Sequence, residues 1–259
     1  MADPADLQFL APIPAVMVKQ QLQLLEAFCP MCEKQNKYQI KPVGKEVFTG
    51  TPPDNNAFEA QPTLLSVQEQ STCFCRFCLR NNREFNMTLG GTDAQGVQHN
   101  YINLHRPFKC TIFCCCFMFN PQELTISSSA GMPLGKVEHE WRFLDACLMP
   151  GLTFWHKVMD ATGATHYYIK VQYPTCCNGC RNMCAPTCCA KVFNMDITDP
   201  QGNTIAQFQN VFPGFLRGCV ADADNLLLEF PAGSTPTQKA LLLGALFLID
   251  FMYFEKEKN

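Results

Sequence analysis

The stretch ALLLGALFLIDFMYF, Ala240 to Phe254, is a nearly unbroken apolar run with one charged residue, Asp250. At about 1.5 Å rise per residue it predicts a helix of roughly 22 Å, which is shorter than the roughly 30 Å hydrocarbon core of a bilayer. A helix that is apolar on all sides has to be enclosed, either by its own chain or by lipid with help from neighbouring segments. The fold of the protein depends on which of these encloses it.

Five stretches that precede this helix each pair alternating apolar residues with a Gly, Asn or Asp turn, which is typical of antiparallel hairpins. They are KYQIKPVGKEVF, EFNMTLGGTDAQGVQHNYINL, ELTISSSAGMPLGKVEHEW, LTFWHKVMDATGATHYYIKV and VFNMDITDPQGNTIAQF. About ten to twelve strands result, and closing such a sheet into a barrel removes its exposed edges. We therefore expect a mainly β protein, a closed antiparallel barrel of about 12 strands.

The apolar helix suits the interior of this barrel, and the same composition suits insertion into lipid. We favour the barrel, with Leu243 and Phe247 as the side chains whose surroundings distinguish the two. Gly244 would allow close approach to a wall strand. Asp250 needs a hydrogen-bond partner or a proton in either setting, and it lies at the unfavourable end of the helix dipole.

The other segments are less regular. Residues 1–14 hold three prolines and predict a short flexible, extended tail, and 15–259 would form one domain. The spacing of apolar residues over Val16–Phe28 predicts an amphipathic helix. The polar, turn-rich run over 50–62 predicts a mobile loop.

Composition limits the function classes. The net charge is −3, and no block of Lys or Arg occurs, so a nucleic-acid partner is not expected. The first residues, MADPAD, lack the basic and apolar pattern of a secretion signal, so we expect the chain to stay on the cytosolic side. The 17 cysteines are then thiols, thioesters or metal ligands rather than a disulfide framework.

The chain resembles the phospholipid scramblases. The blocks that carry the resemblance are LLEAF, NKYQI, INLHRPFKC with FCCCF, PLGKVEHEW, DADNLLLEFP and ALLLGALFLIDFMYFE, in the family's order from about Ala15 to Glu255. The resemblance implies a tubby-like fold, a closed barrel around a central C-terminal helix. It also implies membrane attachment and calcium-stimulated, ATP-independent, bidirectional movement of phospholipids between leaflets.

The cysteine cluster after LHRP is S-palmitoylated in scramblases, so the resemblance implies covalent palmitate on Cys110, Cys114, Cys115 and Cys116. The cluster is shorter here, because Phe117 and the residues after it replace the family's further cysteines. Two or more acyl chains anchor a protein stably, whereas one anchors it marginally. The alternative is that these are unreactive thiols of core-facing strand residues.

The family's proposed calcium loop begins at Asp222. The matching ligands are Asp222, Asp224, Leu226, Leu228, Phe230 and Gly233. Gly233 stands where the family usually has an acidic residue, so the expected calcium affinity is about 10⁻⁴ to 10⁻³ M or weaker. The alternative, which we favour, is a turn capped by the aspartates and followed by a buried strand, LLLEF.

Three Cys-x-x-Cys pairs have the spacing of zinc ligands, Cys29–Cys32, Cys75–Cys78 and Cys177–Cys180. They lie in no zinc-ribbon context, and a chain this rich in cysteine produces such pairs by chance, so we do not expect zinc. No P-loop, dinucleotide motif or acid pair predicts covalent chemistry, and we do not expect an enzyme. The family's proline-rich arm is absent, so proline-binding modules are not expected partners.

The sequence leaves two functions open. The first is a scramblase at the cytosolic face of the plasma membrane, which acts by self-association or local bilayer thinning, because one short helix offers head groups no polar path. The second is a lipid-anchored tubby-like adaptor that binds phosphoinositides or proteins without moving lipid.

Overall fold

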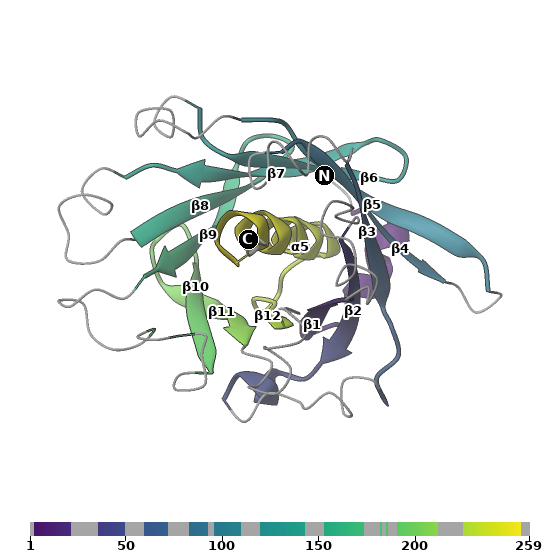
Figure 1. Cartoon of the computed structure of the whole chain (residues 1–259), viewed down its shortest axis with the longest axis horizontal. Helices are drawn as coiled ribbons and strands as arrows, with labels where there is room; N and C mark the ends of the chain where they lie inside the picture. Colours follow the sequence, from purple (N-terminus) through teal and green to yellow (C-terminus); the bar gives the residue numbers. More distant parts are fainter. Residues whose placement is uncertain are drawn as a thin grey trace, which may run out of the picture.

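The computed structural model describes residues 3–21, 36–49, 60–71, 83–92, 96–109, 120–142, 153–173, 182, 185, 191–211 and 225–254. Within this part, strands form a closed antiparallel barrel and a C-terminal helix runs through its middle (Figure 1). The strands are β1 (Ala15–Gln20), β2 (Lys37–Val43), β3 (Leu65–Gln70), β4 (Phe85–Thr92), β5 (Gln98–Arg106), β6 (Glu123–Ser128), β7 (Pro133–Glu140), β8 (Thr153–Asp160), β9 (Thr165–Gln172), β10 (Val192–Thr198), β11 (Thr204–Val211) and β12 (Asn225–Glu229). The prediction of a mainly β barrel of about 12 strands around a buried helix is confirmed.

The barrel joins strands that are neighbours in sequence, and β1 closes it by pairing with β12. In this closing ladder Ala15 lies opposite Glu229 and Lys19 lies opposite Asn225. Four of the five stretches singled out in the sequence form the hairpins β4–β5, β6–β7, β8–β9 and β10–β11. Side chains alternate along each strand, as in β3, where every second residue is buried. The buried set faces the central helix.

The central helix α5 (Pro236–Ile249) begins earlier than the apolar run because the preceding residues form a strong start signal. The Thr235 hydroxyl accepts a hydrogen bond from the Gln238 backbone N–H, and the Gln238 side chain accepts one from the Thr235 N–H. With Pro236 as the first helical residue, this is a complete capping box. The helix continues into one π-helical segment, η6 (Asp250–Phe254).

The helix is enclosed by protein on all sides. All residues from Ala240 to Ile249 are buried, and α5 packs mainly against β6, β7, β8 and the 3₁₀ helix η1 (Ala5–Leu10). Gly244 allows a close approach to the wall, because a Cβ there would lie 2.7 Å from Cγ1 of Ile126 on β6. Among the described residues one helix, Pro236–Phe254, has the length and composition to cross a membrane, but 78% of its most apolar window is buried inside the molecule.

The N-terminal region differs from the sequence expectation. Within the tail expected over residues 1–14, Ala5–Leu10 forms η1, and the side chains of Leu7 and Leu10 are fully buried against α5. The expected helix over Val16–Phe28 begins instead as strand β1, because closing the barrel requires a partner for both β2 and β12. Tertiary pairing overrides the helical spacing here. The rest of that expected helix lies outside the described residues.

Two further stretches need comment. The first expected hairpin, KYQIKPVGKEVF, contains one strand, β2, followed by a short 3₁₀ helix, η3 (Lys45–Phe48). The partner of β2 on its other side is β3, which lies beyond the expected loop over 50–62. Residues 50–59 of that loop lie outside the described residues.

Candidate functional sites

Antiparallel pairing of consecutive strands divides the connections between the two ends of the barrel. The connections β1–β2, β3–β4, β5–β6, β7–β8, β9–β10 and β11–β12 leave and re-enter at one end, and the alternate connections do so at the other. All 17 cysteines of the chain fall, in sequence, within the first set of connections. We call this the cysteine end of the barrel. The cysteines themselves, including Cys110 and Cys114 to Cys116, lie outside the described residues.

The C-terminal end of the central helix lies at the cysteine end. Phe251 stacks on Phe85, at the start of β4, with ring centroids 4.2 Å apart. Phe254 makes an edge contact with Phe193, near the start of β10. Aromatic pairs of this kind each contribute about 0.5–1.5 kcal/mol beyond the area that they bury. The last turn of the helix therefore closes the interior of the barrel at this end.

Asp250, the one charge in the apolar run, is 4% exposed. Its carboxylate accepts a hydrogen bond from the Tyr38 hydroxyl, 3.1 Å away on β2. Tyr38 also packs edge-on against Phe247. The partner that the sequence required for Asp250 thus comes from the barrel wall, which argues for a polar contact built for the protein interior rather than for lipid.

A buried ion pair lies beside this contact. Glu69 on β3 is fully buried and receives two hydrogen bonds from the Arg83 guanidinium, at 2.9 and 3.2 Å. The Ser71 hydroxyl and the Asn36 backbone N–H donate to the same carboxylate. The guanidinium lies 4.8 Å from the centre of the Phe251 ring. Both charges thus have a partner of opposite sign and hydrogen bonds, as charges in a protein interior require.

Two histidines face each other across β7 and β8. His139 lies opposite His156, with ring centroids 5.3 Å apart, and the two side chains are 2% and 0% exposed. The Tyr253 hydroxyl and Nε2 of His156 are 3.3 Å apart, whereas neither ring nitrogen of His139 has a hydrogen-bond partner in the described part of the chain. Loss of hydration lowers the pKa of His139 to about 4, although nearby Glu140 acts in the opposite direction. Burial, and then the neighbouring His139, lower the pKa of His156 well below 6.5.

Of the predicted calcium ligands, those within the described residues lie along strand β12 and the turn after it. Leu226 and Leu228 are buried in β12, which is paired on both sides, by β1 and β11. At about 3.3 Å per residue, Leu226 and Phe230 lie roughly 13 Å apart along the strand, whereas calcium ligands lie about 2.3–2.6 Å from the ion. Gly233 belongs to the turn that follows at the opposite end, with φ of 76°. The buried strand that we favoured from the sequence is present, and Asp222 and Asp224 lie outside the described residues.

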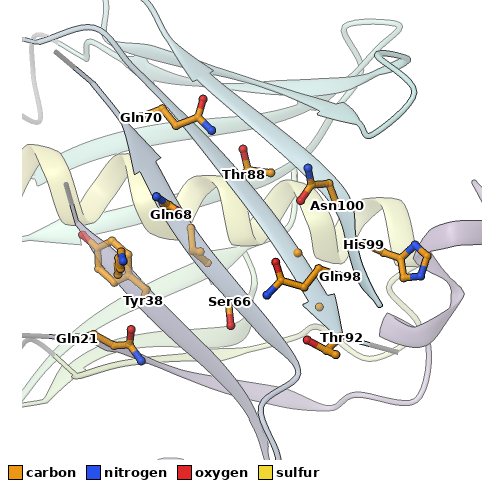
Figure 2. Close-up of a pocket in the computed structure, with 14 residues that line it drawn as sticks. Gln21, Tyr38, Ser66, Gln68, Gln70, Thr88, Thr92, Gln98, His99 and Asn100 are labelled. Atoms are coloured by element: carbon orange, nitrogen blue, oxygen red, sulfur yellow. The ribbon is translucent and has the colours of Figure 1, made fainter. Parts of the chain in front are cut away.

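The outer wall of the barrel carries a polar groove over β2, β3, β4 and β5, with a volume of about 340 Å³ (Figure 2). Amide and hydroxyl side chains predominate in its lining. They include Ser66, Gln68, Thr88, Gln98 and Asn100, with Lys37 at one side. Central helix α5 passes behind this part of the wall, as Figure 2 shows. The described residues hold no cluster of three or more His, Cys, Asp or Glu side chains that could bind a metal ion.

Sequence reasoning missed both the groove and the histidine pair. The polar groove residues on β2 to β5 are ordinary outward positions of alternating strands, and only the register brings them together. The sequence spacing of His139 and His156 matches no motif, so it does not single them out. The alternation of burial in β7 and β8 could have indicated that both face inward, but not that they are opposite each other.

The chain is thus a β protein of a distinct class, a closed antiparallel barrel that encloses its own apolar C-terminal helix. The connections that contain the cysteines in sequence all join strands at one end of this barrel. The family model described as Scramblase matches residues 1–256, and the chain belongs to this family.

Curated relatives agree with this assignment. Phospholipid scramblase 1 of Mus musculus is 30% identical over 258 residues, which cover 99% of this chain and 66% of the relative. Phospholipid scramblase 1 of Homo sapiens is 31% identical over 254 residues, 97% of this chain and 66% of the relative. Phospholipid scramblase 2 of Homo sapiens is 29% identical over 256 residues, with coverages of 98% and 72%. The chain thus spans just under two thirds of the length of the first of these. No solved structure gives a significant match.

Proposed function

We propose that this protein is a membrane-associated phospholipid scramblase that moves lipids between leaflets without covalent chemistry. The observation that carries the proposal is the family match, which extends over nearly the whole chain. The finer proposal is that transport is bidirectional, independent of ATP and stimulated by calcium. Calcium would depend on the carboxylates of Asp222 and Asp224, because the other predicted ligands are spread along β12.

We propose further that acyl chains, rather than the central helix, hold the protein on the membrane. The helix is already enclosed, so its apolar surface is not exposed to lipid. Palmitate on Cys110 and on Cys114 to Cys116 would attach the β5–β6 connection, and with it the cysteine end, to the bilayer. At about 0.8 kcal/mol per buried CH₂, two or more chains give stable attachment. The protein would then be located at the cytosolic face of the plasma membrane.

The enclosed helix also favours a second candidate function. In the described part of the chain, the one helix long enough to span a membrane is enclosed, so it offers a head group no evident route across the hydrocarbon core. The protein would then act as a lipid-anchored adaptor that binds phosphoinositides or proteins without transport. Transport by the first mechanism would instead require self-association or local thinning of the bilayer.

Reconstitution separates the two candidates. Purified protein is placed in liposomes that contain fluorescent phospholipid in both leaflets, and dithionite quenching from outside measures the lipid that reaches the outer leaflet. A scramblase raises the quenched fraction above one half, more so at millimolar calcium, and an adaptor leaves it at one half. Asp222→Ala tests the calcium dependence, and protein with Cys114, Cys115 and Cys116 changed to Ala tests the anchor through loss of thioester-linked palmitate.

A further inference from the structure

The groove on β2–β5 is lined in part by two glycines, Gly90 and Gly91, which add no side chain to it. At Gly90 a Cβ would lie 2.8 Å from the His99 carbonyl oxygen and 3.0 Å from Oδ1 of Asn100. At Gly91 it would lie 3.1 Å from the Leu64 carbonyl oxygen. Neighbouring atoms thus approach both glycines closely, and a side chain at either position would have to displace them. Polar side chains from neighbouring strands line the rest of the groove (Figure 2).

The strand register arranges these side chains in rows. Lys37 lies opposite Gln68, which lies opposite Thr88 on the next strand. In the next row Ser66 lies opposite Gly90, which lies opposite Asn100. One row thus carries an ammonium group and an amide, and the other carries a hydroxyl and an amide on either side of the glycine.

Much of the hydrogen-bonding capacity of the groove is unused. The side chains of Gln21, Gln70, Gln98 and Asn100 make no hydrogen bond to another described residue, and Lys37 forms no ion pair within the same part of the chain. Each amide offers two N–H donors and one carbonyl acceptor. No carboxylate belongs to the lining. A complementary ligand carries negative charge for Lys37, acceptors for the amide N–H groups, and hydroxyl or amine donors for the amide oxygens.

We propose that this groove binds the phosphodiester head group of an anionic glycerophospholipid, with the phosphate beside Lys37 and the hydroxyl- or amine-bearing part between Gln98 and Asn100. The proposal rests on the proposed function and gives it a lipid-binding site. The volume of the groove lies at the lower end of the range of small-ligand sites, about 300–1,000 Å³, which fits one head group rather than a whole lipid.

The direction of the groove favours a lipid over a free sugar phosphate. Gln70 is the last residue of β3, at the cysteine end, and Thr92 is the last residue of β4, at the opposite end. Because both line the groove, the groove follows the strands along the wall. If acyl anchors hold the cysteine end at the bilayer, a head group enters near Gln70 while its own acyl chains remain in the membrane. The groove shields the head group over part of the height of the barrel.

The first experiment measures binding without transport. Full-length protein labelled with ¹⁵N is titrated with glycerophosphoserine, glycerophosphoinositol and inorganic phosphate, and the side-chain NH₂ resonances of Gln68, Gln98 and Asn100 are followed. Two variants test the groove: Lys37→Glu reverses its charge, and Ser66→Trp fills it. Lys191→Glu and Thr204→Trp make the same changes at exposed positions on the wall formed by β10 and β11.

We expect the glycerophospho compounds to shift the groove amides, and both groove variants to weaken this binding about ten-fold or more, a loss equivalent to one charge-assisted hydrogen bond. The two control variants should bind as the wild type does. Unchanged affinity in Lys37→Glu and Ser66→Trp would overturn the proposal. Equal weakening by Lys37→Glu and Lys191→Glu would also overturn it, because general electrostatic attraction would then explain the binding.

The second experiment identifies the source of the head group and separates this inference from the proposed function. The wild type should float with vesicles that contain phosphatidylserine, and Lys37→Glu should float with them less. If the protein binds inorganic phosphate but does not bind these vesicles, the lipid assignment is overturned. Wild type that binds head groups in the groove but fails the dithionite assay refutes scrambling and leaves the groove site standing. If the wild type scrambles lipid, and Ser66→Trp binds head groups and scrambles lipid equally well, the groove site is refuted and the proposed function stands.

Discussion

The buried histidine pair predicts that the barrel loses stability in mild acid. His139 has its pKa lowered to about 4 by burial, whereas an unfolded chain restores a value near 6.5. The unfolded state therefore binds more protons below about pH 6.5, and the free energy of unfolding falls as the pH falls from that value toward 4. Above pH 6.5 both states hold the neutral imidazole, and this contribution to stability is fully present.

The magnitude follows from the two pKa values. Between pH 8 and pH 5, protonation of the unfolded His139 lowers the free energy of unfolding by about 2 kcal/mol, and the full effect, about 3.4 kcal/mol, develops only below pH 4. His156 acts in the same direction, because burial lowers its pKa as well. The pair is therefore expected to contribute more than His139 alone.

Urea unfolding at pH 8 and pH 5, followed by circular dichroism, tests this prediction. His139→Phe places an apolar ring beside Phe154, which already lies 6.0 Å from the imidazole. The variant should lose about 2 kcal/mol less than the wild type between the two pH values. His105→Phe is the matched control, because His105 is exposed on β5 and should leave the pH dependence unchanged. If wild type and His139→Phe lose the same stability on acidification, the assignment to this histidine is refuted.

Three further predictions concern the packing of the helix and the interior charges. The Lys239 ammonium donates hydrogen bonds of 2.8–3.1 Å to the carbonyl groups of Leu10, Ala11 and Ile13, and Lys239→Met removes them. We expect the free energy of unfolding, measured by thermal unfolding, to fall by about 3 kcal/mol, and proteolysis before β1 to become faster. An unchanged cleavage rate would contradict this. Gly244→Ala should cost about 1–3 kcal/mol in urea unfolding because its Cβ meets Cγ1 of Ile126. In an Ile126→Ala chain, which lacks Cγ1, the same substitution should cost less, and an equal cost would show a different cause. Glu69→Ala should lower the free energy of unfolding by about 3–5 kcal/mol, because Arg83 would remain buried without its carboxylate partner. Glu229→Ala, which breaks the more exposed pair with Lys45, should lower it by about 1 kcal/mol or less. Similar values for the two variants would contradict the argument from burial.

The polar groove illustrates what a sequence pattern alone leaves undetermined. Period-two alternation shows that Gln68 and Asn100 face outward, but a shift of one residue in either ladder would move them to the interior. The bulge between Leu89 and Gly90 sets the register that places Asn100 opposite Gly90, with Ser66 on the other side of the glycine. The same limit applies to the calcium motif. Its spacing resembles a loop in the sequence, and the structure shows that its second half is a strand with both neighbours occupied.

The sequence by itself determined the hairpins, the closed barrel and the helix without a polar face, because these follow from local periodicity and from the need to bury apolar surface. It also determined membership of the Scramblase family, because the motifs extend along nearly the whole chain. Only the tertiary structure decided that the helix lies inside protein, that Tyr38 binds Asp250, and that Val16 lies in a strand. These outcomes depend on contacts between residues far apart in the chain. Barrel closure also brings the connections that contain the cysteines to one end, an arrangement that no local pattern specifies.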